Sequence, residues 1–222
     1  MKAGSKRKLQ IAVDIIMSAI LLLQMSYIIA GELIHEITGI SFFVLFIAHH
    51  ILSVNYTKAL FKGRKSAEKT VKLIVDIMLF IIIIMMMLSA VPISKYIFSF
   101  IGLERLSAAG RTVHLFGAYW GFALMNLHIG FHLDRALMKP LKDKKKKPPV
   151  TAALCILFIA GAAMFIKEGI YNYMFLVNRF VFFDESAGIL IFLVKYILIG
   201  AMFAVLGFAV MSALKKKSEK AG

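Results

Sequence analysis

The sequence predicts an all-α integral membrane protein, a single domain built as a bundle of six transmembrane helices. Three observations lead to this prediction. Hydrophobic residues make up 60% of the 222 residues, they gather in runs near the length that spans a bilayer, and basic residues cluster between alternate runs. A soluble core of this size cannot hide so much apolar surface. The runs also lack the polar–apolar alternation of a β-barrel.

The apolar runs give each element in order, with helices expected at residues 9–30, 34–54, 72–91, 112–133, 150–166 and 188–212. The first run follows a basic start, as a signal peptide does. It is longer than a usual signal core and no small-x-small cleavage site follows it, so we expect a retained helix. Residues 167–187 are rich in tyrosine and phenylalanine. An interfacial helix on the outer leaflet is the favoured interpretation, and an extracytoplasmic docking surface is compatible with it.

Basic residues set the expected orientation. Of the 27 lysines and arginines, 21 lie in residues 2–8, 58–72, 135–147 and 215–220, five lie in the alternate loops, and Lys195 falls inside the last helix. By the positive-inside rule, both termini are expected in the cytoplasm. Topology and contact with anionic lipid headgroups explain the net charge of +15, so we expect a lipid bilayer and no nucleic acid as partner.

Four of the six histidines form two pairs with equal spacing. His35 and His49 are fourteen residues apart, and so are His114 and His128. On a helix this spacing places both rings on nearly one face, about 21 Å apart along the axis. The second and fourth helices run in the same direction, so His35 matches His114 in depth near the outer surface, and His49 matches His128 near the inner one. This geometry is typical of a membrane dihaem cytochrome b, in which each iron takes one imidazole from each helix.

Residues around the pairs fit two non-covalent haem b groups. Gly39, Gly117 and Gly121 lie on the histidine-bearing faces and would leave room for a flat macrocycle, and Arg111 would pair with a propionate of the outer haem,. Any one buried histidine is more often a hydrogen-bonded structural residue, and glycines in membrane helices usually serve packing. The single cysteine, Cys155, excludes covalent c-type haem and cysteine-ligated iron–sulfur clusters,.

Several polar residues keep more than one interpretation. His50 is the alternate to His49, although its spacing from His35 is fifteen residues. His132, one turn beyond His128, would anchor a propionate, relay protons, line a quinone pocket or lie in the polar interface. The inner carboxylates Asp14 and Asp76 would serve a quinone site or pair with lysines. The outer carboxylates Glu32 and Glu36 would tune the outer site or be solvated. Lys195 would extend its side chain toward the interface.

Two segments resemble a known family. HEITGISFFVLFIAHHILSVNY and RTVHLFGAYWGFALMNLHIGFHLDRAL are similar to the flavinylation-associated cytochromes, a bacterial family formerly listed as a domain of unknown function. They more broadly resemble ferric-reductase-like transmembrane proteins and dihaem cytochrome b subunits. The resemblance covers about residues 10–135, and Ser53 stands where an asparagine is expected. It implies electron transfer across the bacterial cytoplasmic (inner) membrane to an extracytoplasmic protein that carries covalent flavin.

The predicted function is therefore a relay that passes electrons through two bis-histidine haems, as a subunit of an oxidoreductase system. Six-coordinate iron leaves no open position for a substrate, and the electrons would come from quinol or a cytoplasmic-side donor. One alternative is a membrane quinol dehydrogenase subunit with a bound quinone. Two others are a haem-free, histidine-lined proton or metal-ion transporter and a structural membrane subunit.

Overall fold

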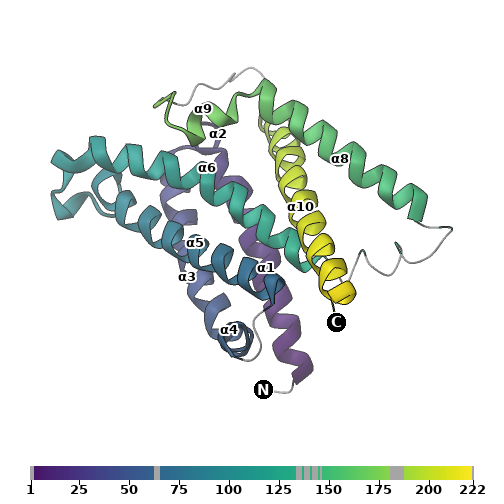
Figure 1. Cartoon of the computed structure of the whole chain (residues 1–222). Helices are drawn as coiled ribbons and strands as arrows, with labels where there is room; N and C mark the ends of the chain where they lie inside the picture. The colour runs from purple at the N-terminus through teal and green to yellow at the C-terminus, as the bar shows by residue number, and fades with distance from the viewer. Residues whose placement is uncertain are drawn as a thin grey trace.

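The computed structural model describes residues 3–62, 66–133, 147–180 and 188–221, together with residues 137, 141 and 145. All regular elements in these residues are helical (Figure 1). Most of the predicted basic loop at 135–147 lies outside the described residues, and so do residues 181–187 of the predicted interfacial segment.

Each predicted helix is present, with ends shifted by several residues. The long helices are α1 Ala3–Met25, α3 Glu32–Leu52, α5 Ala67–Ala90, α6 Ser107–His132, α8 Lys147–Lys167 and α10 Gly188–Ala221. Short helices are α2 Tyr27–Ala30, α4 Val54–Phe61 and α9 Ile170–Met174, and the 3-10 turns η1 Val91–Ile93, η2 Ser99–Ile101 and η3 Glu104–Leu106 lead from α5 to α6.

Two predicted elements differ in extent from what the structure contains. The helix expected at 9–30 is broken between α1 and α2, where the buried Ser26 hydroxyl donates to the carbonyl oxygen of Leu23 at 2.7 Å. Gly31 then turns the chain into α3 with a φ of +86°, a conformation that glycine adopts readily,. Within the described part of 167–187, the expected interfacial helix is limited to the five residues of α9.

Among the described residues, five helices are long and apolar enough to cross a membrane, which confirms the helical membrane class. These spans are Gly4–Met25, Glu32–Leu52, Ala67–Ile93, Lys147–Lys167 and Gly188–Lys217. The 26 residues of α6 would extend about 39 Å, but α6 is not among these apolar spans. It is the central helix, packed against α5 on one side and α10 on another. A helix covered by its neighbours needs less apolar surface of its own, so a membrane crossing by α6 stays a prediction.

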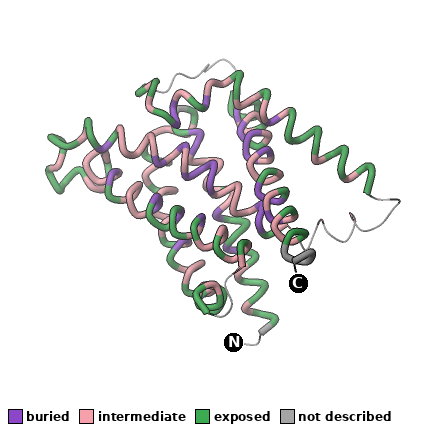
Figure 2. Tube along the Cα trace, viewed as in Figure 1, coloured by how far each residue is buried: buried purple, intermediate pink, exposed green. Residues whose placement is uncertain are grey.

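The helices pack as two groups. In the larger group α5, α6 and α10 pack closely together and α8 lies on α10, whereas α1 and α3 form a separate pair. Figure 2 shows the buried positions concentrated along α6 and α10, with α4 and α8 largely exposed. The α1–α3 pair meets α5 mainly through side chains, with Phe42 and Phe46 packed against Ile83. The backbone of α3 is not packed closely against either α5 or α6.

Glycine allows α6 and α10 to pack with their backbones nearly touching. A Cβ atom on Gly130 would lie 2.1 Å from the carbonyl oxygen of Ala204, and one on Gly207 would lie 2.3 Å from that of Leu127. This close packing holds α6 in the centre of the bundle and positions the histidines that it carries. Both chain termini lie at the same end of the molecule (Figure 1).

Candidate functional site

Two histidines from different helices meet at the end of the bundle away from the termini. The ring centres of His35 on α3 and His114 on α6 are 6.0 Å apart, and their planes make an angle of 68°. The two residues are far apart in the sequence and lie on helices whose backbones are not closely packed. Of the predicted pairs, this one is therefore brought into ring contact.

Backbone and hydroxyl oxygens of α5 orient the His114 ring. Its Nδ1 lies 3.2 Å from the carbonyl oxygen of Met86 and 3.3 Å from Ser89 Oγ. A carbonyl oxygen can only accept a hydrogen bond, so Nδ1 carries the proton and Nε2 keeps a free lone pair. The Ser89 hydroxyl itself donates to Met86 O at 2.9 Å. These partners were not predictable from the sequence, because no pattern within the residues of α5 indicates which ring the helix will face.

His35 has one ring nitrogen without a partner. Its Nδ1 is buried and makes no hydrogen bond within the described residues. The ring lies edge-on to Tyr27, with centres 5.1 Å apart. Burial, followed by the hydrogen bond from Tyr27 Oη to Glu32 Oε1 at 2.9 Å, raises the pKa of Tyr27 to about 12. Tyr27 therefore stays protonated at physiological pH. Because His35 Nδ1 has no hydrogen-bond partner among the described residues, it is available to a ligand or a proton donor.

Carboxylates of α3 tie its outer end to the loop after α5. Glu36 accepts a hydrogen bond from the Ser94 hydroxyl at 2.7 Å, together with bonds from backbone amides of this loop. Glu32 accepts from Lys95 Nζ at 2.5 Å. The sequence left open that these carboxylates are merely solvated. In the structure each of them has hydrogen-bond partners in the protein.

The inner end contains two matched histidine–carboxylate pairs. His49 Nδ1 lies 2.7 Å from Asp14 Oδ1 on α1, and His128 Nδ1 lies 2.7 Å from Asp76 Oδ1 on α5. Metal-binding histidines usually donate their second nitrogen to a carboxylate or carbonyl in this way, which orients the ring and makes it a stronger ligand. The sequence placed both aspartates near this end but predicted lysines or quinone as partners.

The alternate histidines lie in the same inner cluster. His50 Nδ1 donates to the carbonyl oxygen of Phe46 at 2.9 Å, and its ring lies 5.6 Å from Phe80 of α5. His132 has its ring 4.8 Å from that of His128. The inner histidine rings contact each other within each helix, His49 with His50 on α3 and His128 with His132 on α6. Among the described residues, ring contact between α3 and α6 is found in the outer pair.

The predicted glycines are explained by contacts with neighbouring helices. A Cβ atom on Gly117 would lie 2.7 Å from Met86 Cγ, and one on Gly121 would lie 3.2 Å from Ile82 Cγ2, both on α5. A Cβ on Gly39 would lie 2.8 Å from Gln24 Nε2 of α1. The packing interpretation of the sequence analysis thus accounts for all three, and a role beside a haem stays a prediction.

Arg111 lies exposed at the outer end of α6. Its Nη2 is 3.3 Å from Ser107 Oγ of the same helix. This position is compatible with the predicted propionate contact, which stays a prediction. Lys195 on α10 forms an ion pair with Glu168 at 2.9 Å, a partner that the sequence analysis missed.

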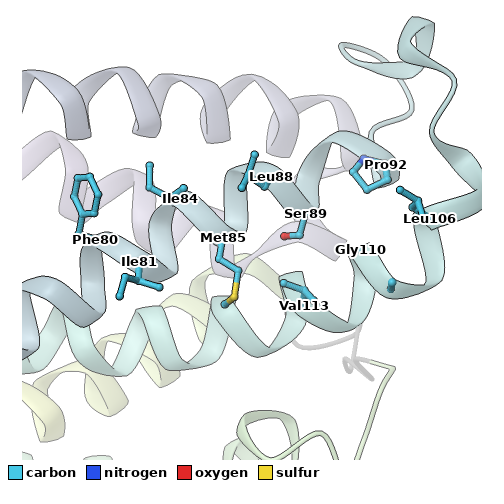
Figure 3. Close-up of a pocket in the computed structure, with 11 residues that line it drawn as sticks. Phe80, Ile81, Ile84, Met85, Leu88, Ser89, Pro92, Leu106, Gly110 and Val113 are labelled. Atoms are coloured by element: carbon cyan, nitrogen blue, oxygen red, sulfur yellow. The ribbon is translucent and has the colours of Figure 1, made fainter.

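An apolar groove of about 590 Å³ runs between α5 and α6 and includes Ser89, the neighbour of His114. Figure 3 shows the side chains that line it, and Ser89 is the one among them with a hydroxyl group. That hydroxyl is also the group next to His114 Nδ1. Ser89 is therefore the side chain that connects the apolar groove to the candidate site.

Within the described residues, no group of three or more histidine, cysteine, aspartate or glutamate side chains could hold a metal ion. A haem makes a smaller demand, because the porphyrin supplies four nitrogen ligands and the protein supplies one or two axial ones. Comparison of the chain with family models, curated proteins and solved structures gave no match.

Proposed function

We propose that this chain is a six-span electron carrier of the bacterial cytoplasmic membrane, with two b-type haems held between α3 and α6. One observation carries the proposal. His35 and His114 come from helices with separate backbones, yet their ring centres are 6.0 Å apart.

That separation fits two imidazoles bound on opposite faces of one iron. Metal–imidazole bonds are about 2 Å long, so the two rings at this separation would be able to hold one metal ion between them. The unpartnered Nδ1 of His35 and the hydrogen bond that orients the His114 ring are compatible with this proposal. An edge-to-face contact of two rings has a similar separation, so haem quantification decides between the two interpretations.

The inner cluster supports a second site of the same kind. His128 is oriented by Asp76, and either His49, oriented by Asp14, or His50, oriented by Phe46 O, would supply the ligand from α3. In each of these rings the second nitrogen is left free. Two sites about 21 Å apart along the helices would nearly bridge the apolar core of a bilayer.

When bound, the haems would supply reversible one-electron chemistry at iron. The residues of this chain would hold and orient them: four histidines as axial ligands, Asp14 and Asp76 as partners of the inner rings, and Arg111 beside an outer propionate. We propose an extracytoplasmic flavin-carrying redox protein as the acceptor, on the basis of the sequence resemblance. Quinol or a cytoplasmic-side protein would be the donor.

The decisive experiment is a dithionite-reduced minus oxidised spectrum of the purified full-length protein with haem quantification. We expect a low-spin b-type spectrum and two haems per chain. His35→Ala, His114→Ala and His128→Ala should each lose one haem, and comparison of His49→Ala with His50→Ala identifies the inner ligand on α3. Thr112→Ala on α6, the helix that carries His114 and His128, is the control and should keep both haems. A colourless protein from haem-supplemented cells would refute the proposal and favour a haem-free transporter or structural subunit.

Oxidation of quinol at the outer site is a second candidate function, favoured by the groove beside His114. A quinol has an apolar tail and a small polar head, which suit the apolar walls and the Ser89 hydroxyl respectively,. We expect quinone in organic extracts of the purified protein, and slower haem reduction by a quinol analogue when Val113→Trp fills the groove. Unchanged reduction in that variant, with both haems retained, would argue against quinol binding there.

A further inference from the structure

We infer that Glu36 is a positioning residue, which locks α3 to the loop after α5 and so sets the separation of His35 and His114. The inference rests on the proposed function, because these two rings are the proposed ligands of the outer haem. Glu36 would thus act on the position of the His114 ring through the loop and not by direct contact.

Both oxygens of the Glu36 carboxylate are held by the loop between η1 and η2. The hydroxyl of Ser94 donates at 2.7 Å, the backbone amide of Lys95 at 2.7 Å and that of Ile97 at 2.8 Å. The amide of Tyr96 lies 3.3 Å from each oxygen. Successive backbone amides that converge on an anion form a fixed concave site, and hydrogen bonds to an ionised group are among the stronger ones. The carboxylate therefore acts as a rigid link between α3 and this loop.

The loop is in turn fixed to α6 close to His114. η1 packs against α6, and a Cβ atom on Gly110 would lie 2.9 Å from Pro92 Cγ and 3.0 Å from Ser89 O. Gly110 precedes His114 by four residues, about one helical turn. A short path of tight contacts thus runs from Glu36 through the loop and η1 to the turn of α6 that carries His114.

This link matters because it joins the outer half of α3 to the turn of α6 that carries His114. The two backbones are not closely packed, and Glu36 directly follows His35 on the helix. At the inner end, the ring contacts between helices join His50 to Phe80 of α5 and His132 to Tyr56 of α4, and neither of these contacts joins α3 to α6. The outer pair is therefore held near its binding geometry before any cofactor enters, which lowers the cost of ordering the site on binding.

The neighbouring carboxylate Glu32 provides a matched control. It also reaches Lys95, but through the ammonium group at 2.5 Å, and it accepts from Tyr27 Oη at 2.9 Å. Its partners are thus side chains. Loss of Glu32 removes a similar negative charge from the same end of α3 without releasing the backbone amides of the loop.

The test compares Glu36→Ala, Glu36→Gln and Glu32→Gln in the full-length, haem-loaded protein. We expect Glu36→Ala to lower the haem content from two toward one per chain and to alter the low-spin EPR signal of the outer haem, which His35→Ala identifies. Glu36→Gln keeps one acceptor oxygen and should give a smaller change. Glu32→Gln loses side-chain partners alone and should change the outer haem less than Glu36→Ala does. Unchanged haem content, EPR signal and redox potentials in Glu36→Ala would overturn the inference.

Two further measurements keep the test decisive. If Glu36→Ala does not accumulate, Ser94→Ala removes one donor to the carboxylate, and an unaltered outer-haem EPR signal in that variant overturns the inference. If the wild type contains no haem, the proposed function fails separately. Amide hydrogen exchange at residues 95–97 then tests the link itself, which predicts faster exchange in Glu36→Ala than in Glu32→Gln, and equal rates contradict it.

Discussion

Asp14 and Asp76 illustrate how single side chains determine the inner half of the candidate site. Charged groups within a bilayer are costly unless they are paired or hydrogen-bonded, and each aspartate is bonded at 2.7 Å to a histidine of another helix. The bond leaves the second ring nitrogen free and gives the imidazole more electron density. A carboxylate in this position also favours the more positive, ferric state of a bound iron.

Replacing these carboxylates should therefore change haem affinity and potential. We expect Asp76→Asn to weaken binding of the inner haem by about 10- to 100-fold and to raise its reduction potential, since the negative charge is lost. Asp14→Asn should do the same only if His49, and not His50, is the ligand on α3. Haem titration of the apo-protein and a potentiometric titration measure both effects. An inner haem unaffected by Asp76→Asn would remove His128 from the proposed ligands.

At the scale of elements, the position of α6 depends on its close approach to α10. Both Gly130 and Gly207 face backbone carbonyl oxygens of the opposite helix, and even a single methyl group there would overlap them. Small residues that let backbones approach are the usual basis of helix association in membranes. The same contacts explain why α6 combines histidine and glycine with moderate apolarity and still occupies the centre of the bundle.

A methyl group at this crossing should separate the helices. We expect Gly130→Ala and Gly207→Ala each to destabilise the protein by about 1–3 kcal/mol, the usual cost of overpacking. Gly4→Ala on α1 is the matched control, because nothing lies within 4 Å of the added Cβ atom. Thermal unfolding in detergent measures the difference. Equal stability of all three variants would show that α6 and α10 do not pack in this way in solution.

For the whole molecule, the open question is its orientation in the membrane. Both termini lie at one end of the bundle (Figure 1), and the excess of lysine and arginine in alternate loops predicts that this end faces the cytoplasm,. The pair His35 and His114 would then lie on the extracytoplasmic side, where the proposed flavin-carrying partner docks.

Cysteine labelling checks this orientation. In a Cys155→Ser background, we expect an impermeant maleimide to label Tyr96→Cys in intact spheroplasts, and Lys62→Cys only after the membrane is permeabilised. Labelling of Lys62→Cys in intact spheroplasts would reverse the orientation and place the outer histidine pair in the cytoplasm.

Some features were predictable because they depend on local sequence. Apolar runs predicted the helices of the chain, and the break at Ser26 was missed because a buried serine leaves the apolar pattern uninterrupted. Five apolar spans are confirmed, while the sixth crossing, by α6, stays a prediction. The equal spacing of the two histidine pairs predicted that His35 and His114 share a level, and their rings are in contact.

The sequence by itself determined the helical membrane class, the order of the helices and the heights of the histidines along them, because these follow from periodicity and rise per residue. Only the tertiary structure decided that Gly117 and Gly121 face α5, that aspartates hold His49 and His128, and that Glu36 binds the loop at 94–97. These contacts depend on how each helix is rotated and tilted against its neighbours. Rotation and tilt are set jointly by side chains far apart in the chain, and no single helix encodes them.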